Sequence, residues 1–127
     1  MPAVRKAVVM IDAGFEVILG TVLVMGVVYA DIDERDFPAP ASDLVIALFG
    51  LALFVVAVVL ATLVKNETLG DRVLGALAAA NAAFAVVLLV WVLAANGFSP
   101  QGRAITWVTI AVLLSLATAQ VFARARR

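Results

Sequence analysis

Two carboxylates lie one helical turn apart inside an otherwise apolar stretch of the chain. Asp12 and Glu16 interrupt the run from Ala7 to Ala30, whose length is typical of a helix that crosses a bilayer. An acidic side chain inside such a helix costs about 2.5–3.5 kcal/mol on insertion scales, and it usually faces a bundle interior or a wet cavity. The pair is suited to proton exchange, or to binding a cationic or hydroxyl-bearing ligand, so it is the first candidate for a functional site.

Other polar residues are expected at matching depths in other helices. At about 1.5 Å per helical residue, counted from the flanking basic residues, Asp12 and Glu16 lie about 9 and 15 Å deep. The same count places Asn81 and Ser115 about 13 Å deep and Thr118 about 9 Å deep. Small side chains share their helix faces, which indicates that these faces turn inward. We therefore predict a polar pocket in the cytoplasmic half of a helix bundle, built from these five residues.

The role of this predicted pocket stays open between three interpretations. As a ligand or proton site, it would hold Glu16 protonated near neutral pH and Asp12 ionised, because Glu16 lies deeper and Asp12 lies nearer the positive end of its helix. As a structural clasp, Glu16 would bond to Asn81 and fix the register of the helices. The third interpretation is contact with another membrane subunit. Gln120 is expected on a different helix face, as an interfacial residue or part of a protein contact.

Four apolar runs fill almost the whole chain and must position these residues. The 127 residues are 65% hydrophobic, with a mean hydropathy of +1.16, which is too apolar for a soluble domain of this length. We predict an all-α, integral membrane four-helix antiparallel bundle that runs up, down, up, down. It forms a single domain, residues 1–127, with helices near 7–30, 44–64, 73–95 and 104–123. The longest connection is short, so any site lies within or between the helices.

The basic residues predict the orientation of the bundle. Seven of the nine fall on one side of a four-pass chain: Arg5, Lys6, Lys65, Arg72, Arg124, Arg126 and Arg127. Arg35 and Arg103 fall on the other side. By the positive-inside rule both termini are cytoplasmic and the acidic first loop faces outward. We expect a multi-pass protein of the cell membrane, or of the inner membrane if the source is bacterial.

Several kinds of chemistry are excluded by composition. The chain has no cysteine and no histidine, which removes disulfides, thiol chemistry, axial haem ligands and the usual zinc sites. The acidic stretch 31–36 lacks the glycine and the closing glutamate of a calcium-binding loop, so we expect it to be solvated. No metal or cofactor is therefore expected.

Small residues recur at a spacing of four in the third apolar run. Gly75, Ala79 and Ala83 follow the pattern that lets two helix backbones approach closely. We predict a close-packing helix face there, either within the bundle or between two copies of the chain.

The first run also resembles a known family. Glu16-Val17-Ile18, with Gly20-Thr21 just beyond, resembles the first helix of the small multidrug resistance transporters, and Trp91 lies in the third helix as a family tryptophan does. The resemblance implies a protein of four short helices. It also implies that Glu16 is a site shared by protons and cationic drugs.

These observations favour a binding protein over an enzyme. We expect a non-enzymatic bundle that binds a hydrophobic or amphipathic small molecule, such as a quinone, lipid or terpenoid, in a polar-lined pocket around Glu16. The alternatives are a proton-coupled transporter that uses Glu16 and an accessory subunit of a larger membrane complex. The expected partners are the lipid bilayer and a lipophilic small molecule, with a second copy or another membrane protein as a further partner. No nucleic-acid partner is expected.

Overall fold

The computed structural model describes residues 3–32, 34–38 and 41–125 of the chain. Within this part the chain is all-α, with no strand, and its elements are α1 (Ala3–Val28), the short 3-10 helix η1 (Glu34–Asp36), α2 (Asp43–Lys65), α3 (Asp71–Ala94) and α4 (Pro100–Ala125). All four α-helices are long and apolar enough to cross a membrane. The prediction of an all-α protein with four candidate membrane spans is thus confirmed.

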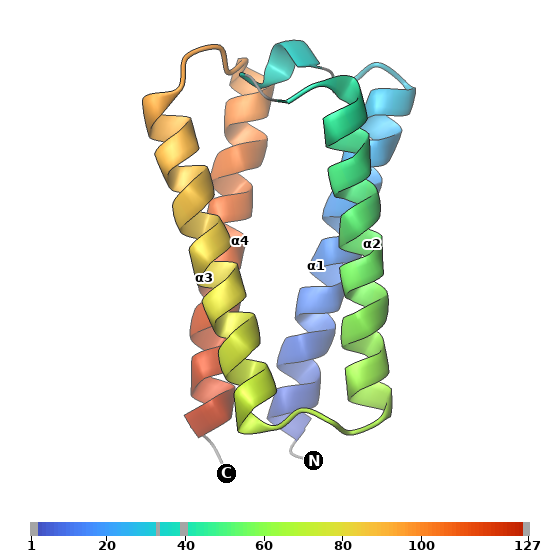
Figure 1. The fold of residues 1–127 in the computed structure, drawn as a ribbon, viewed down its shortest axis with the longest axis vertical. Coiled ribbons are helices and arrows are strands. Elements are labelled where there is room, and N and C mark those ends of the chain that lie inside the picture. Colours follow the sequence, from blue (N-terminus) through green and yellow to red (C-terminus); the bar gives the residue numbers. More distant parts are fainter. Residues whose placement is uncertain (1–2, 33, 39–40, 126–127) are drawn as a thin grey trace.

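The elements lie side by side, and the chain reverses its direction between successive α-helices (Figure 1). One end of the bundle holds both chain termini and the connection 66–70 between α2 and α3. We call this end the base. The other end holds η1 and the connection 95–99 between α3 and α4, and we call it the top.

All four α-helices begin before the predicted apolar runs, and capping side chains account for two of these starts. The Ser42 hydroxyl accepts a hydrogen bond from the Val45 N–H at 3.2 Å and caps α2. The Ser99 hydroxyl accepts from the Gly102 N–H at 2.9 Å, and Pro100 occupies the first helical position of α4. Consequently α4 begins four residues earlier than the start predicted at residue 104.

Two helices end through a residue with left-handed backbone geometry. Ala30 has a φ of 60°, and the Asp31 N–H donates to the Gly26 carbonyl at 2.8 Å, as in a Schellman motif. This turn ends α1 at Val28, before the end of the apolar run. Glu67, with a φ of 54°, closes α2 in a similar way.

The four helices are organised as two hairpins. α1 packs along α2, and α3 packs along α4, whereas the two hairpins meet chiefly through α1 and α4. Among the described residues, the backbones of α2 and α3 stay apart. Glycines allow the close approach within the first hairpin, since a Cβ on Gly20 would lie 2.8 Å from the Gly50 carbonyl oxygen.

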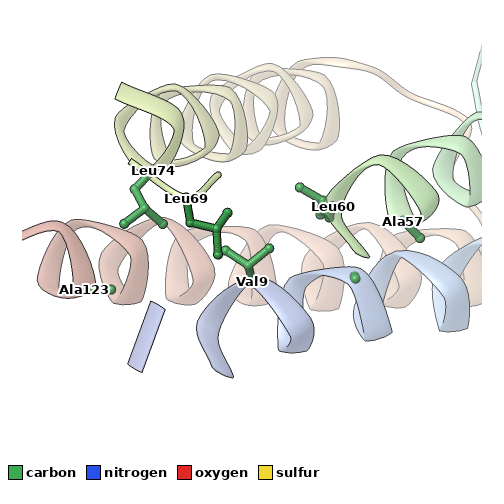
Figure 2. Packing of buried hydrophobic residues seen from close by; sticks show 7 residues of the cluster. Val9, Ala57, Leu60, Leu69, Leu74 and Ala123 are labelled. Atoms are coloured by element: carbon green, nitrogen blue, oxygen red, sulfur yellow. The ribbon is translucent and has the colours of Figure 1, made fainter. Parts of the chain in front are cut away.

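The hairpins are joined at the base by a buried hydrophobic cluster. Figure 2 shows side chains from all four helices and from the α2–α3 connection in this cluster, among them Val9, Leu60, Leu69, Leu74 and Ala123. Toward the top the two hairpins diverge (Figure 1). The base is therefore the part of the bundle where all four helices share one core.

The predicted packing face of α3 does not serve the bundle. Ala79 and Ala83 are exposed, and Gly75 lies against the side chain of Arg124. α3 instead turns the face that carries Asn81 and Ala85 inward. A carboxamide in an apolar helix needs hydrogen-bond partners. This need, and not the packing of the small residues, determines which face of α3 turns inward.

Candidate functional site

A cluster of polar side chains joins the two hairpins in the base half. The Asn81 Nδ2 donates to Asp12 Oδ2 and to Gln120 Oε1, both at 3.0 Å. The Gln120 Nε2 donates to the same Asp12 oxygen at 2.5 Å. Asp12 is 1% exposed and Gln120 is 0% exposed, so the three residues link α1, α3 and α4 out of contact with solvent.

Glu16 completes this cluster from one turn further along α1. It is 6% exposed and, like Asp12, belongs to the buried face of α1. Asp12 Oδ1 has no hydrogen-bond partner within the described part of the chain. The sequence predicts an ionised Asp12 beside a protonated Glu16, and we call these two residues the acid–carboxylate pair.

Two of the five predicted pocket residues lie elsewhere. Ser115 and Thr118 are on the exposed surface of α4, where their hydroxyls donate to the Ala111 and Leu114 carbonyls at 2.8 Å. The structure brings Asp12, Glu16 and Asn81 together but not these two.

The prediction for Gln120 was also wrong, because this residue faces inward. A hydroxyl can bond to a carbonyl one turn back in its own helix, whereas a carboxamide has donors and an acceptor that need partners elsewhere. Gln120 therefore turns into the bundle, where its carboxamide bonds to Asn81 and Asp12. Its carboxamide, placed in an apolar helix, was the signal in the sequence.

Arg5 closes the base below the acid–carboxylate pair. It is buried, and its guanidinium donates to the Leu69 carbonyl at 2.9 Å, to Asp71 Oδ1 at 2.6 Å and to the Arg124 carbonyl at 3.3 Å. These bonds tie the start of α1 to the α2–α3 connection, to α3 and to the end of α4. The sequence indicated Arg5 only as a marker of orientation. Arg5 forms its ion pair with Asp71, so it is not the counter-ion of the buried residues Asp12 and Glu16.

A cavity of about 400 Å³ lies between the hairpins in the top half. Its lining is almost wholly apolar and comes from all four helices and from Phe37 and Ala41 in the connection before α2, with Leu19, Ile46, Phe84 and Trp91 among the other lining residues. Thr106 and Thr109 also line it, but their hydroxyls donate to carbonyls of α4 itself. Glu16 is not among the lining residues, so this space differs from the polar pocket that the sequence predicted.

Aromatic rings close the cavity at the top. Phe37 stacks on Trp91 with ring centroids 6.0 Å apart, and Phe98 meets Trp91 edge-on at 4.8 Å. η1 is held over them because the Ser99 hydroxyl donates to Asp36 Oδ1 at 2.5 Å. A Cβ on Gly102 would collide with the Asp36 carbonyl oxygen, so a glycine is needed where η1 rests on α4.

Comparisons with known proteins give no relative for this chain. No family model, no curated protein and no solved structure matches it. Within the described ranges, no three acidic side chains lie close enough together to hold a metal ion. The features that indicate a function are therefore the acid–carboxylate pair and the apolar cavity.

Proposed function

We propose that this protein is a multi-pass membrane protein that binds a hydrophobic small molecule in the cavity between its two hairpins. The observation that carries the proposal is the cavity itself, about 400 Å³ with an almost wholly apolar lining. Sites for small ligands commonly have volumes of about 300–1,000 Å³ and mostly apolar walls. The acid–carboxylate pair lies outside the cavity, so we assign the protein no catalytic step.

The proposed orientation places the base in the cytoplasm and the top outside. The described basic residues at the base support it, namely Arg5, Lys6, Lys65, Arg72 and Arg124. The cavity would then lie in the outer half of a cell membrane.

The two tryptophans of the chain provide a direct test. Trp91 lines the cavity, whereas Trp107 is exposed on the outside of α4. Trp107→Phe leaves Trp91 as the only tryptophan, and Trp91→Phe leaves Trp107 as the matched control. A dibrominated fatty acid, titrated into the protein in detergent, should quench Trp91 saturably and Trp107 only in proportion to its concentration in the micelle.

A variant that fills the cavity makes the test specific. Ala41 lines the cavity, so Ala41→Phe in the Trp107→Phe background should abolish the saturable quenching. If the quenching of both tryptophans rose equally with the concentration of the fatty acid and did not saturate, the proposal would be refuted.

A second candidate function is proton-coupled transport, and the acid–carboxylate pair favours it. Asp12 and Glu16 lie at the junction of the two hairpins, where a relative movement of the hairpins would open them to water. The resemblance of residues 16–21 to the small multidrug resistance transporters fits the same role for Glu16. In liposomes, uptake of a lipophilic cation driven by a pH gradient should disappear in Glu16→Gln while the helix content persists. Equal uptake by both proteins would exclude this role.

A further inference from the structure

We propose that the cavity is filled sideways, through the gap between α2 and α3, by an acyl chain of a zwitterionic phospholipid. This inference rests on the proposed function, and it adds the class of ligand and the route of entry. Three observations support it, namely the seals at both ends of the cavity, an aromatic pair across the gap and the charge of the top.

Both ends of the cavity are sealed by specific contacts. Toward the base, the hydrogen-bonded cluster of Asp12, Asn81 and Gln120 spans the space between the hairpins. Toward the top, the Phe37 and Trp91 rings stack beneath η1, which is bonded to the start of α4. Entry from either end would have to break a buried polar network or lift η1.

The side between α2 and α3 is closed far more loosely. Val45 of α2 and Val87 of α3 both line the cavity, yet they are 46% and 62% exposed on the outer surface. Phe49 and Phe84 meet across the gap, with ring centroids 5.4 Å apart and planes inclined by 39°. These rings lie between backbones that stay apart, so rotating two side chains is enough to widen the gap.

The surroundings of the gap indicate what enters. The two valines would face lipid chains at this depth, and the cavity offers almost no polar group, so the part that enters is hydrocarbon and its polar head stays at the top. In the sequence, the segment 31–43 that leads from α1 to the first residue of α2 carries five acidic residues and one basic residue, Arg35, and Arg103 follows near the start of α4. This excess of negative charge repels an anionic head group and attracts the ammonium of a zwitterionic one.

The absence of cysteine from the chain allows a clean test of the side entrance. In the Trp107→Phe background, Phe49→Cys and Phe84→Cys are joined by a bifunctional thiosulfonate. The protein is then mixed with micelles that contain dibrominated phosphatidylcholine. Linking should slow the quenching of Trp91 by about tenfold or more, and cleaving the linker with a reductant should restore the rate. Unchanged quenching of the linked protein would refute entry from the side.

Matched variants separate the possible outcomes. Linking Asp36→Cys to Ser99→Cys locks η1 onto the start of α4, and it should leave the rate within about twofold of the unlinked protein. If this link slowed the quenching of Trp91 and the link across the gap between α2 and α3 did not, the entrance would lie at the top. If the Phe49 and Phe84 variants do not fold, Val45→Cys and Val87→Cys provide a second link across the same gap. Loss of saturable quenching in every unlinked protein would refute the proposed function instead.

The head group is tested with lipids of identical chains. Dibrominated phosphatidylcholine should saturate the quenching of Trp91 at a lower concentration than dibrominated phosphatidylglycerol. Equal or reversed saturation would refute the preference for a zwitterionic lipid. High salt should narrow the difference, because the charges at the top are exposed to water.

Discussion

Among the polar residues in the helices, the chemistry of the side chain decided which ones turn inward. Ser115 and Thr118 satisfy their hydroxyls within α4 and can face outward. Asn81 and Gln120 cannot do so, and they converge on Asp12. A buried carboxyl group needs hydrogen-bond donors, which these two carboxamides provide.

Replacing Gln120 with leucine should therefore weaken the bundle. Asp12 would lose one of its two amide donors, and an unsatisfied buried acceptor costs about 1–3 kcal/mol. Unfolding in detergent followed by circular dichroism would measure this loss. Thr118→Val, on the exposed side of the same helix, should change the free energy of unfolding by less than about 0.5 kcal/mol. Equal losses in both variants would contradict the inward position of Gln120.

The ion pair between Lys6 and Glu67 predicts a small dependence of stability on pH. The hydrogen bond from the Lys6 ammonium lowers the pKa of Glu67 below its ordinary value of 4.5. The folded protein thus binds this proton less readily than the unfolded chain does. The contribution is present above about pH 4.5 and is lost as the pH falls through the lowered pKa.

Glu67→Gln tests this dependence against the natural protein. The two free energies of unfolding should differ at pH 6 and converge toward pH 3. Lys6→Gln should remove most of the difference, because it removes the cause of the shift. A difference that grows as the pH falls would contradict the sign.

At the scale of the elements, the helix ends and the glycines determine how the hairpins form. Ser42 and Ser99 begin two of the helices, and Ala30 and Glu67 end two of them with left-handed geometry. The contact between α1 and α2 depends on residues without a side chain. The glycine pair, and not the small-residue face of α3, makes this close approach within the bundle.

Gly20→Ala should destabilise the first hairpin. The added methyl group would lie 2.8 Å from the Gly50 carbonyl oxygen, and a backbone atom cannot turn away as a flexible side chain can. We expect a loss of about 1–3 kcal/mol in the free energy of unfolding. Gly14→Ala is the matched control, since nothing lies within 4 Å of its new Cβ and alanine favours a helix. A stabilised Gly20→Ala variant would contradict the close approach.

At the scale of the whole molecule, the bundle is joined at the base and divided toward the top. The hydrophobic cluster, Arg5 and the acid–carboxylate pair all lie in the half where the hairpins meet. The cavity occupies the half where they diverge. The contacts that stabilise the bundle thus lie at the base, and the binding that we propose lies toward the top.

Arg5→Gln and Lys6→Gln remove the same charge from the same end of the chain, and they should have different effects. Arg5 is buried and bonds to three segments, so its loss leaves the Leu69 and Arg124 carbonyls without their donor. We expect it to lower the free energy of unfolding by about 1–3 kcal/mol. Lys6→Gln breaks only an exposed pair and should cost clearly less. Equal effects would mean that Arg5 acts only through its charge.

The distribution of apolar residues along the sequence determined that the chain is all-α, with four apolar segments near the observed positions. Spanning a bilayer requires about 20 apolar residues, and in lipid such a segment must satisfy its backbone within its own helix. The inward position of Asp12 and Glu16 also followed from the sequence, because a carboxyl group is costly against hydrocarbon.

Only the tertiary structure decided which helices pair, where the cavity lies and that Gln120 joins Asp12. The sequence of a helix that is apolar on nearly all sides does not indicate which side turns toward the bundle interior, since lipid and a protein interior are similar environments for a leucine. A few polar side chains and the Gly20–Gly50 approach determine that rotation instead. The partners of the polar side chains lie 39 to 108 residues apart in the chain, so they are known only once the helices have packed.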